Sequence, residues 1–252
     1  MNKKVVVFKA TFVFLLLFSL YSNINIKAYS NLTQNYYINV LHGIYGEDEK
    51  RLVAEIPNSN IKLYYVQYDE VEGRYRGFIL EINDVKKYFE WENVDNPSRK
   101  PELILSDLNK DGKNELVVIL NKGYGTGVQD EEVHVIKQDL FFYELLVENP
   151  LIPLHKNAHL ENSPEQVIII LNNKKTVLNK RGMTALPYED LGAGYGHHIG
   201  FEANNNILYS RVLLGVGTNP GVGEFIIKYI YKDEIFQVQS IDFIPRPEYL
   251  SK

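Results

Sequence analysis

Short runs of β-branched and aromatic residues, each ended by Asn, Asp, Gly or Pro, are the feature that most restricts how this chain can fold. Val, Ile, Tyr and Phe favour the half-buried surface of a sheet, whereas Asn and Asp tolerate the left-handed backbone of tight turns. Helical periodicity is nearly absent. The pattern therefore predicts an all-β fold, made mainly of antiparallel hairpins that form a sandwich or packed sheets.

The expected strands cover about half of residues 29–252, above the usual share for a globular chain. They are the runs 36–45, 61–68, 74–82, 85–91, 103–105, 116–120, 133–136, 141–147, 167–171, 175–178, 199–203, 207–216, 224–231 and 235–243. The clearest hairpin turns are expected at Asn83-Asp84, Asn172-Asn173, 204–206 and 232–234.

Helical structure is expected only as single turns, at residues 164–167 after a Ser163 cap and at residues 186–191. The least patterned stretch is 149–165, which contains three prolines. It either joins two halves of a single all-β region at 29–252 or forms one long connection within it.

The first 28 residues have the layout of a secretory signal peptide. A basic segment ends at Lys9, and the apolar stretch 10–21 that follows has the roughly 7–15 residues of a signal-peptide core, short of the roughly 20 that span a bilayer. Cleavage after Ala28 produces a mature chain from Tyr29, whereas an uncleaved segment remains as a membrane anchor. No second apolar run is long enough to cross a bilayer. The sequence thus predicts a protein that is secreted or held at the cell envelope.

Charge and cysteine content exclude several classes of function. Residues 1–28 contain four lysines and no acid, so the remaining chain has 23 basic and 32 acidic residues. Such an acidic chain has no long-range attraction for nucleic acid, and its balance suits the collection of divalent cations. The absence of cysteine excludes disulfides, thiol catalysis and Cys-ligated zinc.

One acidic segment, residues 107–115, carries the pattern of a calcium loop. Asp107, Asn109 and Asp111 stand at positions 1, 3 and 5, the Lys113 carbonyl at position 7 and the Glu115 carboxylate at position 9. Gly112, between them at position 6, permits a sharp turn. Calcium takes 6–8 oxygen ligands, which such alternating side chains can supply around one centre. The alternative interpretation is an Asx-rich hairpin turn without a metal.

The loop is not an EF-hand, because position 12 is Val118 instead of Glu and both flanks read as strands. It resembles the Asp-x-Asn-x-Asp-Gly-x-x-Asp/Glu loop of FG-GAP and VCBS-type repeats over about 15 residues. The resemblance implies calcium ligation by Asp107, Asn109, Asp111, the Lys113 carbonyl and Glu115. That family usually builds propellers from several copies, and this chain has one copy, so a propeller is not expected. The whole chain also resembles exported proteins of unassigned activity from spore-forming Gram-positive bacteria.

Other patterns are better explained by structure than by catalysis. The glycine-rich segments 123–127, 192–200 and 215–223 are not followed by a helix, as a phosphate-binding loop requires. They are expected to be wide turns, although glycine-lined loops can also line a ligand cleft. His155 and His159 share a face only in a helix, and the adjacent pair His197-His198 faces opposite ways in a strand. No zinc site is expected from them.

The sequence favours an exported, non-enzymatic envelope, surface or extracellular binding or structural protein with a calcium-stabilised loop. The competing hypothesis is a secreted hydrolase that acts on cell-wall or extracellular polymer through paired carboxylates, such as Glu131-Glu132 or Glu189-Asp190. Contact with the cell wall, a spore surface or extracellular polymer is compatible with both. Trp91 and the tyrosines offer a carbohydrate platform, but aromatic residues in strands more often form the core.

Overall fold

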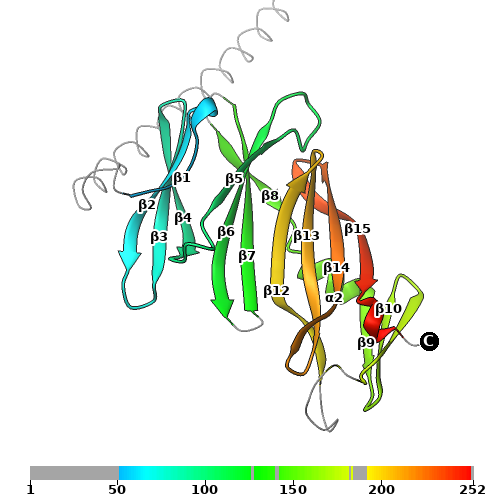
Figure 1. The fold of residues 1–252 in the computed structure, drawn as a ribbon. Helices are drawn as coiled ribbons and strands as arrows, with labels where there is room; N and C mark the ends of the chain where they lie inside the picture. Colours follow the sequence, from blue (N-terminus) through cyan, green and yellow to red (C-terminus); the bar gives the residue numbers. More distant parts are fainter. Residues whose placement is uncertain (1–50, 126–127, 140–141, 182, 184–191, 251–252) are drawn as a thin grey trace, which may run out of the picture. The chain divides into compact units, whose positions relative to one another are not determined.

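The computed structural model describes residues 51–125, 128–139, 142–181, 183 and 192–250 (Figure 1). Of these residues, 69% lie in strands and 8% in helices, so the all-β prediction is confirmed. The described chain divides into two compact units, the first at 51–68 and 76–91 and the second at 69–75 and 92–250. The predicted signal peptide, the expected strand at 36–45 and the expected helical turn at 186–191 lie outside the described residues.

The first unit is a four-stranded sheet in chain order: β1 (Leu52–Ile56), β2 (Ile61–Asp69), β3 (Arg74–Ile82) and β4 (Val85–Val94). Phe89 stacks on Trp91 with ring centroids 4.1 Å apart, and the Trp91 side chain is only 6% exposed. Trp91 therefore belongs to the core and is not an open carbohydrate platform.

The second unit contains an eight-stranded sheet whose order is β12-β13-β14-β15-β8-β7-β6-β5. Its strands are β5 (Glu102–Ser106), β6 (Glu115–Gly125), β7 (Val128–Lys137), β8 (Tyr143–Val147), β12 (Ala193–Asn204), β13 (Ile207–Val216), β14 (Asn219–Lys232) and β15 (Ile235–Pro245). Figure 1 shows β12 to β15 running side by side. The sheet returns on itself, because β12 also pairs in parallel with β7, His198 with Gln129 and Ile199 with Asp130.

A smaller sheet completes the second unit, with the order β11-β10-β9. It consists of β9 (Ala158–Asn162), β10 (Gln166–Leu171) and β11 (Lys174–Asn179), and the helix α2 (Leu151–Asn157) precedes it. The sequence interpretation missed α2 and β9, because it took 149–165 as unpatterned. The expected helical turn at 164–167 is wrong, since Gln166 already begins β10.

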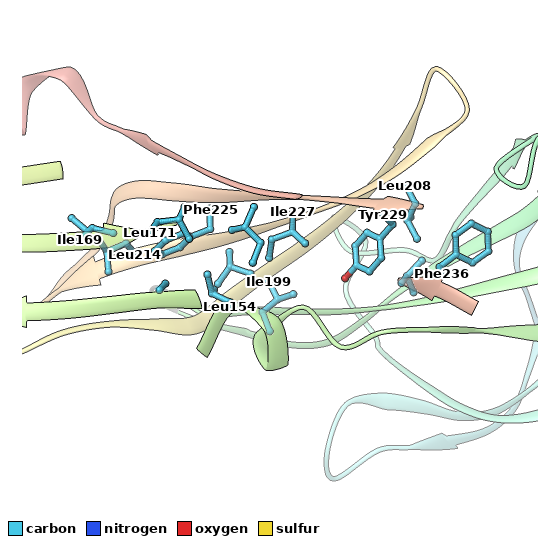
Figure 2. Close-up of a cluster of buried hydrophobic side chains, with 14 of the residues drawn as sticks. Leu154, Ile169, Leu171, Ile199, Leu208, Leu214, Phe225, Ile227, Tyr229 and Phe236 are labelled. Atoms are coloured by element: carbon cyan, nitrogen blue, oxygen red, sulfur yellow. The ribbon is translucent and has the colours of Figure 1, made fainter. Parts of the chain in front are cut away.

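The main core of the second unit lies between these elements. Along β13 every second residue is buried, as expected for a strand with one face against a core. Figure 2 shows side chains from α2, β10, β12, β13, β14 and β15 meeting in this core. Phe225 at its centre is fully buried and contacts Tyr195 and Phe243, with ring centroids 5.3 and 4.9 Å away.

The hairpin turns follow the turn chemistry expected from the sequence. Both central residues have positive φ angles at Asn83-Asp84, Asn172-Asn173, Asn205-Asn206 and Asp233-Glu234. Two consecutive left-handed residues define the turns whose twist matches that of the flanking strands. Asn and Asp adopt this backbone more easily than other non-glycine residues, which explains why these positions were predictable. None of the helices in the described ranges is both long and apolar enough to cross a membrane.

Candidate metal-binding loop

The loop 107–114 connects β5 to β6, whose pairing places Ser106 directly opposite Glu115. Its flanks are strands, as predicted. Positive φ angles at Lys110 (62°) and Gly112 (85°) curl the chain between them. A Cβ at Gly112 would meet no atom within 4 Å, so the glycine is needed for its left-handed backbone and not for close packing.

One amide joins three of the predicted ligand residues. Nδ2 of Asn109 donates to Oδ2 of Asp111 at 3.1 Å and to Oε1 of Glu115 at 2.7 Å. Oδ1 of Asn109 accepts the backbone N–H of Asp111 at 2.8 Å, which fixes the orientation of the amide. The side chains of these residues therefore turn toward one another.

Asp107 and Lys113 complete the loop through backbone contacts. Oδ2 of Asp107 accepts the N–H of Gly112 at 3.2 Å, and Oδ1 of Asp111 accepts the N–H of Lys113 at 2.9 Å. This second hydrogen bond lowers the pKa of Asp111. Oδ1 of Asp107 is buried and has no hydrogen-bond partner among the described residues. A buried carboxylate oxygen without a partner carries a desolvation cost that a cation would relieve.

Glu115 is the buried member of the group, with 1% of its surface exposed. Its Oε2 accepts the N–H groups of Leu108 at 3.0 Å and Asn109 at 3.2 Å. Burial raises the pKa of Glu115 despite these bonds, and the nearby charges of Asp111 and Asp107 raise it further. The repulsion between Glu115 and the charges of Asp111 and Asp107 is eased when Glu115 binds a proton or when a cation lies nearby.

Neighbouring strands hold the loop in place. Oδ1 of Asn206, in the β12–β13 turn, accepts a hydrogen bond from Oγ of Ser106 at 3.1 Å and from the N–H of Asp107 at 3.3 Å. Nζ of Lys137 lies 3.7 Å from Oδ2 of Asp111. Sequence reasoning identified Asn206 only as a turn residue, and no local pattern connects it with a loop about a hundred positions earlier.

The loop residues carry oxygen donors of the type that calcium prefers, but their side chains are not arranged around one metal position. Among the described residues, no group of three or more His, Asp or Glu side chains is placed to hold a metal ion. The NH2 group of Asn109 lies where it satisfies two carboxylates. Calcium would instead be held by oxygens of Asp107, Asn109, Asp111, Glu115 and the Lys113 carbonyl, the hard donors that it prefers.

His155 and His159 do not form a joint site in the described structure. His155 belongs to α2 and His159 to β9, so they do not share a helix face. Nδ1 of His155 lies 3.0 Å from the Tyr195 hydroxyl. His198 contacts the Oε1 atom of Gln129 through Nε2 at 2.7 Å.

A second acidic group lines a hollow of about 230 Å³ beside β7, and it includes Glu131, Glu132 and Glu148. Glu131 accepts the N–H of Phe201 at 2.8 Å and a bond from the Gln129 amide, and burial raises its pKa. Oε2 of Glu148 accepts a backbone N–H at 2.8 Å, and Oε2 of Glu132 lies 3.4 Å from a lysine Nζ. The other suggested pair, Glu189-Asp190, lies outside the described residues.

Comparisons with protein-family models, curated protein sequences and solved structures find no match to this chain.

The raised pKa of Glu115 predicts a pH dependence of stability. The folded state favours the protonated acid, so the contribution of Glu115 is fully present below its ordinary pKa of 4.5 and is lost as the pH rises through the folded value. In the presence of a chelator, raising the pH from about 4 to about 7 should lower the melting temperature of the wild type relative to Glu115→Gln. Thermal unfolding of both proteins measures this difference. A difference that stays constant or moves the other way contradicts the assignment.

Proposed function

We propose that this chain is an exported, non-enzymatic envelope, surface or extracellular protein with a binding or structural role, and that calcium stabilises its loop 107–115. The observation that carries the proposal is the unpartnered, buried Oδ1 of Asp107 beside the buried Glu115. Both belong to a loop whose oxygen-bearing side chains turn toward one another. A hard cation offsets the repulsion of these carboxylates more fully than the single Asn109 amide does.

The calcium ion has a structural role in this proposal. Asn206 ties the start of the loop to the β12–β13 turn, and Lys137 ties Asp111 to β7. A cation in the loop would hold these elements as a disulfide does in other exported proteins, and this chain contains no cysteine. The resemblance of the loop to FG-GAP and VCBS-type repeats supports the same ligand set.

The location outside the cytoplasm rests on the N-terminal sequence. The basic segment, the apolar stretch of signal-peptide length and Ala28 support export, and the acidic balance of the remaining chain supports an environment rich in divalent cations. Cell wall, spore surface and extracellular polymer are the proposed contacts. The resemblance to exported proteins of spore-forming Gram-positive bacteria points the same way.

Calcium should stabilise the folded chain by mass action. At a calcium concentration about a hundredfold above the Kd, the expected gain in unfolding free energy is about 2.7 kcal/mol. Asp107→Ala and Asp111→Ala should abolish the gain while the chain still folds in a chelator. Thermal unfolding with and without calcium measures it.

Asp242→Ala is the matched control, because Asp242 is an exposed aspartate in β15, outside the loop. It should retain the full calcium shift. Calcium stabilisation through the loop is ruled out if the wild-type melting temperature does not change with calcium. It is also ruled out if all four proteins show an equal shift.

Cell fractionation tests the location. An antibody against the chain should detect it in the medium, in the wall fraction or on the spore surface, and N-terminal sequencing should begin at Tyr29. An intact N-terminus in a membrane fraction identifies the uncleaved anchor instead. A full-length protein in the cytoplasm would contradict export.

The hollow beside β7 favours a second candidate, a polymer hydrolase, since burial raises the pKa of Glu131 as a general acid requires. The hydrogen bonds of Glu131 and Glu148 to backbone N–H groups account for both carboxylates without catalysis. Both side chains therefore have a structural role.

An activity assay separates the two candidates. The purified chain should release no reducing ends from cell-wall or extracellular polysaccharide, because its carboxylates are committed to the fold. Release that disappears in Glu131→Gln, while the variant keeps the wild-type melting temperature, would replace our proposal with the hydrolase.

A further inference from the structure

Two glycine-rich segments, 192–200 and 215–223, meet at one hollow of the second unit. The first opens β12, and the second spans the end of β13, its turn and the start of β14. The hollow has a volume of about 480 Å³, within the roughly 300–1,000 Å³ of small-molecule sites. Sequence reasoning treated both segments as wide turns, whereas the structure places most of their residues in paired strands.

The floor of the hollow is open at Gly192 and Gly194, whereas a Cβ at Gly215 would lie 3.1 Å from the backbone oxygen of Asn219. Gly194 pairs directly with Gly215, and both lie on the same sheet face as Leu213. Cβ atoms at Gly192 and Gly194 would meet no atom within 4 Å, and neither glycine has a positive φ angle. Neither backbone strain nor close packing requires glycine at these two positions. Their effect is to leave room above the sheet.

A bulge in β12 brings two imidazoles to the rim. The register with β13 shifts between Tyr195 and Ile199, and Gly196 has a φ angle of 104°. A bulge of this kind re-aims the side chains that follow it. His197 and His198 line the hollow as a result.

Hydrogen bonds fix the state of His198. The NH2 group of the Gln129 amide donates a hydrogen bond to Glu131, so its Oε1, 2.7 Å from Nε2 of His198, accepts a hydrogen bond from the Nε2–H group. Nδ1 of His198 therefore carries the lone pair. Burial and the charge of Arg99 lower the pKa of His198, which favours the neutral ring.

The lining residues that the structure describes carry no charged side chain. None of the lining residues that the structure describes is Asp, Glu, Lys or Arg, although charged residues make up 23% of the chain. Leu213, Pro220 and the glycine backbone form an apolar floor, and His197 and Thr218 add polar groups. Among these described lining residues, a charged ligand would find no side chain of opposite charge. A hydroxylated ring would present its C–H face to the floor and its hydroxyl groups to the rim.

We propose that the hollow at Gly192, Gly194, Gly215, Leu213, His197 and Thr218 binds an uncharged saccharide unit, either as a free sugar or as part of a polymer. The idea deepens the proposed binding role and rests on it for the extracellular setting. It does not depend on calcium, because the hollow and the loop 107–115 share no residue.

Titration with defined sugars tests the site. Cellobiose, maltose and N,N′-diacetylchitobiose are the neutral probes, and galacturonic acid and adenosine represent charged and aromatic ligands. At least one neutral disaccharide should give a saturable calorimetric or NMR signal that includes the ring resonances of His197 or His198. Galacturonic acid and adenosine should give none. A free monosaccharide and a polymer carrying the same unit then distinguish the two sources.

In Gly194→Leu the new side chain occupies the open space of the hollow. It should weaken binding of that sugar at least tenfold without lowering the melting temperature. Gly125→Leu is the matched control, since Gly125 also has no atom within 4 Å of a Cβ and lies outside the hollow. It should bind like the wild type.

Four results would overturn the saccharide site: no response to any neutral disaccharide, preferred binding of galacturonic acid or adenosine, unchanged binding in Gly194→Leu, or equal losses in both variants. Asp107→Ala separates this proposal from the calcium loop. Sugar binding that survives in Asp107→Ala supports the hollow whatever calcium does. If calcium raises the melting temperature but no sugar binds, only the saccharide proposal fails.

Discussion

The backbone pairing of β7 is the constraint on which the second unit depends. β6 pairs with β7 along nearly its whole length, so β8 and β12 must share the opposite edge. β8 uses the end of β7 at Val135 to Lys137, and β12 uses Gln129 and Asp130 near the start. This division also brings the strand with the imidazole-bearing bulge against the strand that carries Glu131.

Both candidate sites depend on this arrangement. The calcium-type loop begins where β5 ends and is held by a side chain from the β12–β13 turn. The hollow proposed to bind a saccharide lies at the other end of the same two strands, at Gly194 and Gly215. β12 and β13 therefore contact the loop 107–114 at one end and line the hollow at the other. No single short motif describes either arrangement.

The sequence predicted the parts of the fold that local chemistry controls. The hairpins at Asn83-Asp84 and Asn172-Asn173 were predictable, because turn residues and the flanking β-branched runs agree. The helix α2 was not, since Pro153 and three polar residues leave it only one buried side chain, Leu154, and no helical pattern. β12 was expected only from Ile199 onward, because its first half is glycine-rich and glycine has a low strand propensity.

For the candidate sites, the sequence identified the residue types but not the hydrogen-bond partners or the burial of each side chain. The sequence interpretation placed Asp107 and Glu115 in one acidic loop, whereas Glu115 is the first residue of β6, and its burial depends on that strand and its neighbours. Glu131 resembled a catalytic carboxylate, and only the fold shows that it binds the Phe201 N–H. A partner about seventy positions away leaves no trace in a sequence pattern. Spacing alone therefore overestimates how many carboxylates are available for chemistry.

The contact between Asn206 and Asp107 explains why a cation in this loop would matter beyond the loop itself. A cross-link between distant positions reduces the conformational entropy of the unfolded chain more than a cross-link within one turn. A cation held by residues 107–115 alone closes a short loop and gains little in this way. If it also orders the Asp107 N–H that binds Asn206, it closes a connection of about a hundred residues that contains β6, β7, β8 and the whole small sheet. The size of the calcium effect then depends on how strongly the turn of β12 and β13 is coupled to the loop.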